Sequence, residues 1–485
     1  MSPRPRAFPA WLRGIASVCL LLFATSHSQA EEYDVVILNG RVVDPESNSD
    51  EVRNLGIRGN TIQAITAERL RGRTMVDASG LLVSPGFIDL SVHDLDGKPP
   101  YALRVLDGVT TALTLERGTA DLDRWYAEHQ GKAPINYGVS IGHVPIRKLV
   151  MRDTTPGPTP SGDAAHKAAS DEELAEIKRL IEQGMRRGAV MLGLVIQWTP
   201  GASPWEIQEA LRIAARFGAP SMVHIRYQGA VEPLGSVLGL EEIIGAAAVT
   251  GAPVHIIHIT SMGLRATPHL LQMIHGAQSH GLDITADAYP YTGASNPIRS
   301  SMLDEGWQAR LGIDYHDLQW TATGERLTAE SFARYRETDG RVVLHMIPEH
   351  IVQLAVADPS IIMISDSVTG HPRSAGSFAR VLGKYVREAK ALSLMDALRK
   401  LTLLPAQRLE RRVPMMKNKG RIRVGADADL TVFDPGRIID KASYEAPTLP
   451  SEGIKYVLVN GVVVVRDGAP LTGIFPGRPV RAPAQ

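Results

Sequence analysis

The central part of the chain, residues 86–414, alternates short apolar runs with longer segments whose apolar residues recur at helical spacing. The apolar run that leads to His93 is the first strand-like segment. The others cover residues 109–115, 135–141, 189–196, 220–226, 254–261, 283–289, 342–347 and 361–366. Strands that alternate with helices are typical of a parallel sheet, and these segments are numerous enough to close a (β/α)8 barrel. We therefore predict an α/β protein built on a TIM-like barrel.

Helix start signals lie between these strands. Ser170 followed by Glu173 forms a capping box, and the next apolar residues fall on one helical face. Ser203 and Pro204 mark another helix start, because proline fits the first helical position. These signals support the strand and helix alternation of the predicted barrel.

Pairs of short strands are predicted at both ends of the chain. The pairs cover residues 33–44, 54–65 and 454–465. The first is expected to turn at Asn39-Gly40, because Asn-Gly is the strongest local hairpin signal. We expect residues 31–85 and 415–485 to be halves of one small β-sandwich, with a barrel of residues 86–414 inserted between them.

The first 30 residues have the pattern of a cleavable signal peptide. Three arginines precede an apolar run at residues 14–24 that is too short to span a bilayer, and small residues up to Ala30 supply a cleavage site. A retained membrane anchor is the alternative. We predict a periplasmic or secreted protein, cut near Ala30, with no stable membrane anchor. Cys19, the only cysteine, lies in this leader, so the mature chain would have neither a disulfide nor a thiolate ligand.

The charge composition favours a small-molecule partner. Lys plus Arg and Asp plus Glu are equal at 52 each, so removing the three leader arginines leaves a net charge of −3. The sequence has no run of like charges that would mark a nucleic-acid arm or a polybasic membrane patch. We therefore expect no nucleic-acid partner, and the composition leaves the oligomeric state open.

Potential metal ligands stand at the ends of several predicted strands. His93 ends the first, and Glu116, His224, His258 and Asp366 stand at or just after the ends of four others. Because barrel strands all end on the same side, we expect these side chains to converge. Imidazole nitrogens and carboxylates together suit zinc or another divalent transition ion.

Short motifs that recur in one known family run through most of the chain. They cover residues 85–93, 108–118, 142–147, 224–226, 258, 287–291, 365–366, 371–387, 450–461 and 475–478. Together they resemble the amidohydrolase superfamily, and within it the branch of D-aminoacylases and N-acyl-D-amino-acid deacylases, including D-glutamate deacylases. The resemblance spans about residues 33 to 482.

This resemblance implies metal-dependent hydrolysis of the N-acyl bond of N-acyl-D-amino acids, acidic ones among the candidates, with a metal-activated water as the nucleophile. Asp366 would be the catalytic general base and acid, taking a proton from the water and returning it to the departing amine. His224 and His258 would hold the more tightly bound ion. Other branches bridge two metals with a carboxylated lysine, but residues 189–199 contain none. Glu116 is then the natural bridge.

Ser91 departs from the family pattern, which has histidine at both positions of the first ligand motif. Residues two apart on a strand point the same way, so Ser91 and His93 share a direction. The resemblance implies that these two positions, together with Asp366, would hold the second metal. A serine hydroxyl is a poor zinc ligand, which predicts a weakened or empty second site. Three outcomes stay open: an enzyme with one zinc ion, an enzyme that uses another divalent metal, or an inactive relative. The first is favoured, because the other ligands remain.

Substrate-binding candidates lie beside the ligand set. Arg373 is the first candidate for the D-amino-acid carboxylate, because a guanidinium binds carboxylates with two donors. Tyr291, Arg226 and His143 follow, although packing, an ion pair and a loop hydrogen bond are their respective structural alternatives. Thr260 stands where many relatives carry a carboxylate-binding lysine, so the pocket is expected to differ from theirs.

The working hypothesis is an N-acyl-D-amino-acid deacylase with a lid at about residues 295–340 that excludes water from the site. A catalytically impaired amidohydrolase-like protein that binds acylated amino acids is the first alternative. A β-aspartyl or D-dipeptide hydrolase is the second. Metal content tests the first alternative, and parallel substrates test the second.

Overall fold

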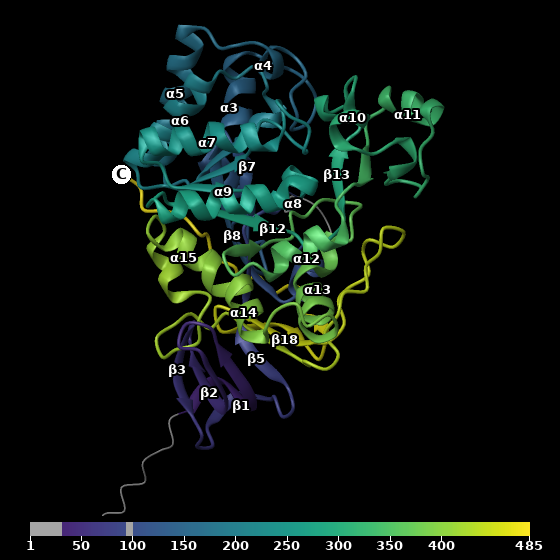
Figure 1. Cartoon of the computed structure of the whole chain (residues 1–485). Coiled ribbons are helices and arrows are strands. Elements are labelled where there is room, and N and C mark those ends of the chain that lie inside the picture. The colour runs from purple at the N-terminus through teal and green to yellow at the C-terminus, as the bar shows by residue number, and fades with distance from the viewer. Residues whose placement is uncertain (1–31, 94–99) are drawn as a thin grey trace, which may run out of the picture.

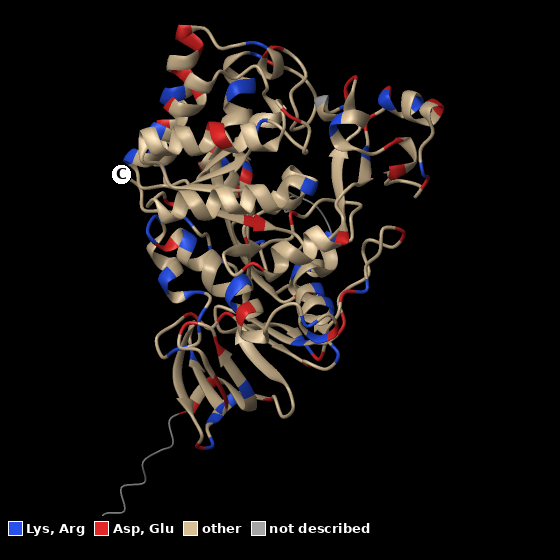
Figure 2. Cartoon of the chain, viewed as in Figure 1, with Lys and Arg blue, Asp and Glu red and all other residues tan. Residues whose placement is uncertain are grey.

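The computed structural model describes residues 32–93 and 100–485, which contain a barrel, a β domain made by both chain ends and a small insert (Figure 1). The predicted signal peptide, residues 1–30, lies outside the described residues. In the described ranges, every helix is too short or too polar to cross a bilayer. Figure 2 shows basic and acidic residues interspersed along the elements, in keeping with the balanced composition.

A parallel sheet forms the centre of the fold. Within the described residues it has eight strands, in the order β16-β12-β11-β10-β9-β8-β7-β6. They are β6 (Phe87–Asp89), β7 (Val109–Thr119), β8 (Asn136–Gly142), β9 (Leu192–Val195), β10 (Ser221–His224), β11 (Val254–Ile256), β12 (Ile284–Ala288) and β16 (Ile361–Met363). Beyond β6 and β16, the Ser367 carbonyl accepts from the His93 N–H, and the Ser367 N–H donates to the Ser91 carbonyl, both at 3.2 Å. These bonds bring the two edge strands together, and the predicted barrel is confirmed.

Helices connect the strands of the barrel. They are α1 (Pro100–Leu106), α2 (Leu122–His129), α3 (His143–Val150), α4 (Asp163–His166), α5 (Asp171–Arg186), α6 (Pro204–Arg216), α7 (Ser236–Thr250), α8 (Ile259–Gly263), α9 (Thr267–Ser279), α12 (Glu349–Ala357), α13 (Arg373–Arg380), α14 (Leu394–Leu398) and α15 (Leu404–Glu410). The predicted starts are confirmed: Ser170 and Glu173 form the capping box of α5, and Ser203 caps α6.

One predicted barrel strand belongs to a different sheet. Residues 342–347 fall mostly in β15 (Arg341–His345), which pairs antiparallel with β13 (Gly293–Pro297) and β14 (Leu318–Trp320). An apolar run of this length indicates a buried strand but not the sheet that buries it. With α10 (Trp307–Leu311) and α11 (Ala329–Arg336), these strands form an insert between β12 and β16, where a lid was predicted (Figure 1).

Both chain ends combine in the β domain. Its strands are β1 (Glu32–Asp44), β2 (Ser49–Arg58), β3 (Thr61–Thr66), β4 (Arg71–Asp77), β5 (Leu82–Pro85), β17 (Leu430–Phe433), β18 (Ile454–Val459), β19 (Val462–Arg466) and β20 (Ala469–Pro470). β5 pairs with β17, and Ile37, Leu55 and Leu430 share one buried core. The prediction that the two ends build a common β unit around the barrel is confirmed.

The Asn39-Gly40 pair is a bulge inside β1 rather than the predicted turn. Asn39 has a φ of 59°, and its N–H donates to the Asn54 side chain at 2.8 Å. Before the bulge β1 pairs with β4, and after it Arg41 pairs with Leu82 of β5. The Asn-Gly pair does contain a residue in the left-handed backbone conformation, as predicted. Here that residue lies in a bulge at which β1 changes its partner from β4 to β5.

Candidate metal centre

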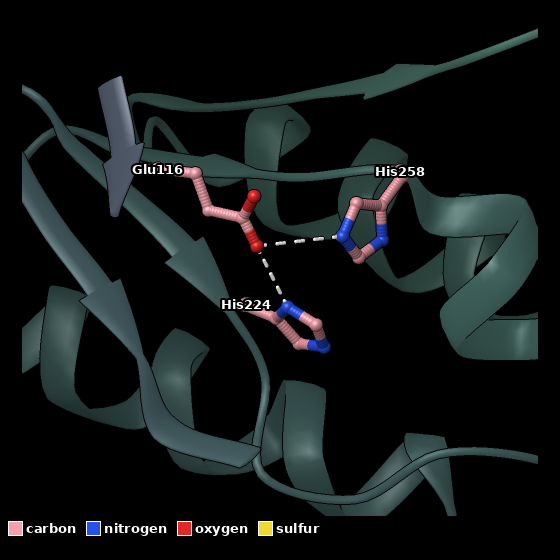
Figure 3. A group of neighbouring side chains, drawn as sticks. All are labelled: Glu116, His224 and His258. Atoms are coloured by element: carbon pink, nitrogen blue, oxygen red, sulfur yellow. Dashed lines mark hydrogen bonds and ion pairs between the residues drawn. The ribbon is translucent and has the colours of Figure 1, made fainter. Parts of the chain in front are cut away.

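The predicted ligands His93, Glu116, His224, His258 and Asp366 lie together at the carboxyl end of the barrel. Glu116 Oε1 is 2.8 Å from His224 Nδ1 and 3.6 Å from His258 Nε2 (Figure 3). Glu116 Oε2 is 2.7 Å from His93 Nε2, which is 3.0 Å from Asp366 Oδ1. Two groups result, Glu116 with His224 and His258, and Glu116 with His93 and Asp366; in each, the donor atoms lie within 4.8 Å of one another. Glu116 joins the two groups.

The backbone turns sharply where two of these ligands sit. His258 follows β11 with a φ of 34°, and Asp366 follows β16 with a φ of 49°. Residues other than glycine rarely adopt positive φ, and such strain clusters at functional sites. The His258 N–H also donates to the buried carboxylate of Asp287, which fixes the turn. The surrounding structure thus holds both side chains in place.

Ion pairing outweighs burial in setting the pKa values of His93 and Glu116. Burial, the largest single influence, lowers the pKa of His93, but the Glu116 and Asp366 carboxylates together raise it to about 9. Burial raises the pKa of Glu116, yet His93 and the hydrogen bonds from His224 and His258 hold it well below its ordinary value. The centre therefore favours positive charge between ionised carboxylates.

The donor set fits a divalent metal ion. Buried imidazoles and carboxylates are the ligands that zinc and related ions take in proteins. Ser261 Oγ lies 2.9 Å from His258 Nδ1, the nitrogen that faces away from Glu116. A partner at that position orients a metal-binding histidine and fixes its tautomer.

Ser91 is fully buried, and its Oγ has no hydrogen-bond partner among the described residues. The backbone at Ser91 bridges to Thr114 of β7. Ser91 is also absent from the lining of the cavity above the ligands, within the part of the chain that the structure describes. With serine at position 91, the group formed by His93, Glu116 and Asp366 contains one histidine.

A cavity of about 240 Å³ lies over the cluster. Arg373 is in its wall, as predicted, with Nη2 2.9 Å from Asp366 Oδ2 and its guanidinium 4.6 Å from the centre of the Tyr289 ring. The insert supplies another part of the wall, including Ser295 and Arg341. The predicted lid segment is thus a folded insert that borders the site.

Tyr291 does not line this cavity. Its hydroxyl donates to Asp440 at 3.2 Å, on the side of the C-terminal segment. Tyr289, two residues earlier at the end of β12, lines the cavity instead. The structure therefore places Tyr289, and not the predicted Tyr291, at the cavity. The chain has already left the strand beyond residue 288, so the side-chain alternation of a strand no longer holds there.

Arg226 and His143 are also engaged elsewhere. Arg226 Nη2 is 2.6 Å from Glu242, and the buried His143 Nε2 is 2.7 Å from Glu206. These are the structural alternatives that the sequence left open, and neither side chain lines the cavity over the cluster. Glu206 also pairs with Arg147 at 2.6 Å, which makes a buried ion-pair network outside the site.

Two arginines of the cavity wall were missed as substrate candidates. Arg117 directly follows Glu116, and its Nη2 donates to the His93 carbonyl at 3.3 Å. Arg341 donates to the hydroxyl and carbonyl of Ser295 at 3.2 and 3.0 Å. Burial and the nearby Arg373 lower the pKa of Arg341 to about 10. Arg341 directly precedes the apolar run of residues 342–347. Because that run was assigned to the barrel, the position of Arg341 in the cavity wall was not predicted.

Comparisons with known proteins agree with this geometry. The family model described as "Amidohydrolase family" matches residues 164–465. The chain is 30% identical to the N-acyl-D-glutamate deacylase of Alcaligenes xylosoxydans xylosoxydans, over 94% of this chain and 98% of the relative. It is 28% identical to the D-aminoacylase of the same organism, over 93% of this chain and 98% of that protein.

Solved structures align over 93% of this chain and 100% of theirs at 25% identity. An N-acyl-D-glutamate deacylase from Bordetella bronchiseptica, complexed with zinc and a phosphonate inhibitor that mimics the tetrahedral intermediate, has a TM-score of 0.79. A D-aminoacylase studied for its binuclear metal centre, with one-metal activation and second-metal attenuation, has a TM-score of 0.77.

Proposed function

Because the chain belongs to the amidohydrolase family, in the branch of D-aminoacylases and N-acyl-D-amino-acid deacylases, we propose that it hydrolyses the amide bond of N-acyl-D-amino acids. The family match confirms the resemblance predicted from the sequence. The observation that carries the proposal is the Glu116 carboxylate, which joins two largely buried ligand groups beneath an arginine-lined cavity.

Zinc is the proposed metal, because a relative binds it and the donor set suits it. Glu116, His224 and His258 would hold one ion. The other group offers only His93 with two carboxylates, and the buried Ser91 replaces a second histidine, so we propose that this site binds metal weakly or not at all. A zinc ion would polarise the acyl carbonyl and lower the pKa of a bound water.

Asp366 is the proposed general base and acid. Burial raises its pKa, but Arg373 and His93 outweigh burial and keep the carboxylate ionised. One oxygen is 3.0 Å from His93 Nε2 and the other is 2.9 Å from Arg373 Nη2, so the carboxylate is held from both sides. It can accept a proton from the attacking water and return that proton to the leaving amine.

The arginines of the wall would bind the amino-acid part. Arg373 beside Asp366 would orient the α-carboxylate next to the reacting atoms. Arg341, from the insert, has no carboxylate partner among the described residues and could pair with a second carboxylate. This distribution of charge supports a preference for acidic D-amino acids.

Parallel assays with zinc-loaded protein test the proposal. N-acetyl-D-glutamate, N-acetyl-D-leucine, N-acetyl-L-glutamate and a β-aspartyl dipeptide would be compared by amine release. We expect cleavage of the D-amino-acid derivatives, with N-acetyl-D-glutamate preferred. Cleavage of the β-aspartyl dipeptide alone, or of none of the four, would contradict the proposal.

We also propose that the protein is exported, on the basis of its N-terminal sequence. The basic leader, the apolar run of residues 14–24 and the small residues before Glu31 support cleavage near Ala30. N-terminal sequencing of the protein recovered from the periplasm or medium should begin near Glu31. Recovery of the intact Met1 terminus from the membrane fraction would refute export with cleavage.

A further inference from the structure

A second cavity adjoins the metal-site cavity. It measures about 330 Å³ and shares Gln197, Gln228 and Met302 with the first. Gln197 Nε2 donates to Gln228 Oε1 at 3.0 Å, and Gln228 Nε2 donates to the Ser261 carbonyl at 2.6 Å. Two amide side chains and one flexible thioether therefore separate the two spaces. Methionine adapts its shape readily, because its unbranched side chain has three rotatable bonds.

The surface that the second cavity offers is mainly apolar. Pro200, Leu234 and Leu311 line it, and Met302 closes it toward the metal site. Its charged residues already have partners. Arg226 pairs with Glu242 at 2.6 Å, and Asp304 pairs with Arg336 at 2.8 Å. Arg310 donates to three backbone carbonyls. An apolar ligand portion therefore suits this space better than a charged one.

The two ends of the substrate would point to opposite sides of the metal centre. The strand order β16-β12-β11-β10-β9 is an arc around the carboxyl end of the barrel. Asp366 and Arg373 follow β16 at one end of the arc, while Gln228 and Gln197 follow β10 and β9 at the other. The metal ligands lie between these two ends. When the amide bond of the substrate lies at the ligands and the amino-acid carboxylate binds Arg373, the acyl group therefore points toward the second cavity.

We propose that the second cavity receives the acyl chain, so that the preferred substrates are N-acyl-D-amino acids with a linear apolar acyl group longer than acetyl. The inference rests on the proposed function, because that function sets the direction of the amide. Each buried methylene should strengthen binding about fourfold until the cavity is filled.

A series of N-(alkylsulfonyl)-D-glutamates tests this inference by binding alone, because the sulfonamide is tetrahedral and is not hydrolysed. Dissociation constants of the zinc-loaded full chain would be measured by calorimetry from methyl to octyl. Leu234→Asp places a charge in the second cavity, and Leu149→Asp is the matched control on α3. Both leucines are exposed, at 59% and 62%, so neither change disturbs the core.

The expected result is a dissociation constant that falls about fourfold per methylene in the wild type and in Leu149→Asp. In Leu234→Asp, this gain should be largely lost. Equal dissociation constants across the series, absent binding, or an unchanged gain in Leu234→Asp would overturn the inference. Hydrolysis of N-acetyl-D-glutamate, measured separately, reports on the proposed function, so either can fail without the other.

Discussion

Replacing Asp107 with asparagine tests a buried carboxylate that positions the helix carrying Arg373. Asp107 accepts backbone N–H groups from Phe378 at 2.9 Å and Ala379 at 3.0 Å, and the Ser451 hydroxyl at 2.8 Å. Phe378 and Ala379 belong to α13, whose first residue is Arg373. The carboxylate therefore ties the loop before β7 to the helix that borders the metal site.

Burial raises the pKa of Asp107 to about 7, although these hydrogen bonds and Arg104 act in the opposite direction. In the unfolded chain an aspartate titrates near pH ~3.9. Between about pH 4 and pH 7 the native state thus keeps a proton that the unfolded chain has released, so stability falls as pH rises through this window and levels off above it. A difference of roughly three pKa units corresponds to ~4 kcal/mol in the free energy of unfolding.

Urea unfolding at several pH values between 4.5 and 8 measures this effect. Asparagine does not titrate. In Asp107→Asn, the free energy of unfolding should therefore fall less across this pH window than in the wild type, by up to ~4 kcal/mol. Asp339→Asn, which removes an exposed carboxylate, is the matched control and should keep the wild-type profile. Identical pH profiles for the wild type and Asp107→Asn would refute the reasoning.

Three further predictions concern the site. His258→Ala and Glu116→Ala should each lower the amount of metal bound per chain, measured by elemental analysis after dialysis. If both variants bind as much metal as the wild type, the assignment of His258 and Glu116 as ligands is wrong. Arg373→Ala should lower kcat/KM for N-acetyl-D-glutamate about 10- to 100-fold, because a hydrogen bond to a charged group is worth ~1.5–3 kcal/mol; an unchanged value would argue against carboxylate binding there. Arg341→Met should lower kcat/KM for N-acetyl-D-glutamate more than for N-acetyl-D-leucine, and equal losses would contradict a role in side-chain recognition.

The ligand cluster could be predicted because most of its members stand at or just after strand ends. His224 is the last residue of β10, and His258 and Asp366 follow β11 and β16 by two and three residues. Parallel barrel strands bring such positions together wherever the connecting helices run. The sequence therefore predicted which side chains meet. The absence of a lysine at residues 189–199 also pointed to Glu116 as the residue that joins the two groups.

The substrate residues were harder to predict, because their partners come from distant segments. Glu206, which holds the His143 side chain, lies 63 residues away in the chain, and Asp440, which holds Tyr291, lies 149 residues away. No local pattern reveals such pairs. In the same way, the apolar run at residues 342–347 predicted a strand but not its antiparallel partners, and so the position of Arg341 was missed.

Zinc titration of the metal-free full chain, with hydrolysis of N-acetyl-D-glutamate as the readout, tests the central claim most directly. The account predicts amine release that rises to a plateau at one zinc ion per chain, with no release from N-acetyl-L-glutamate. Absence of hydrolysis at every zinc concentration, or equal rates for the two enantiomers, would contradict it.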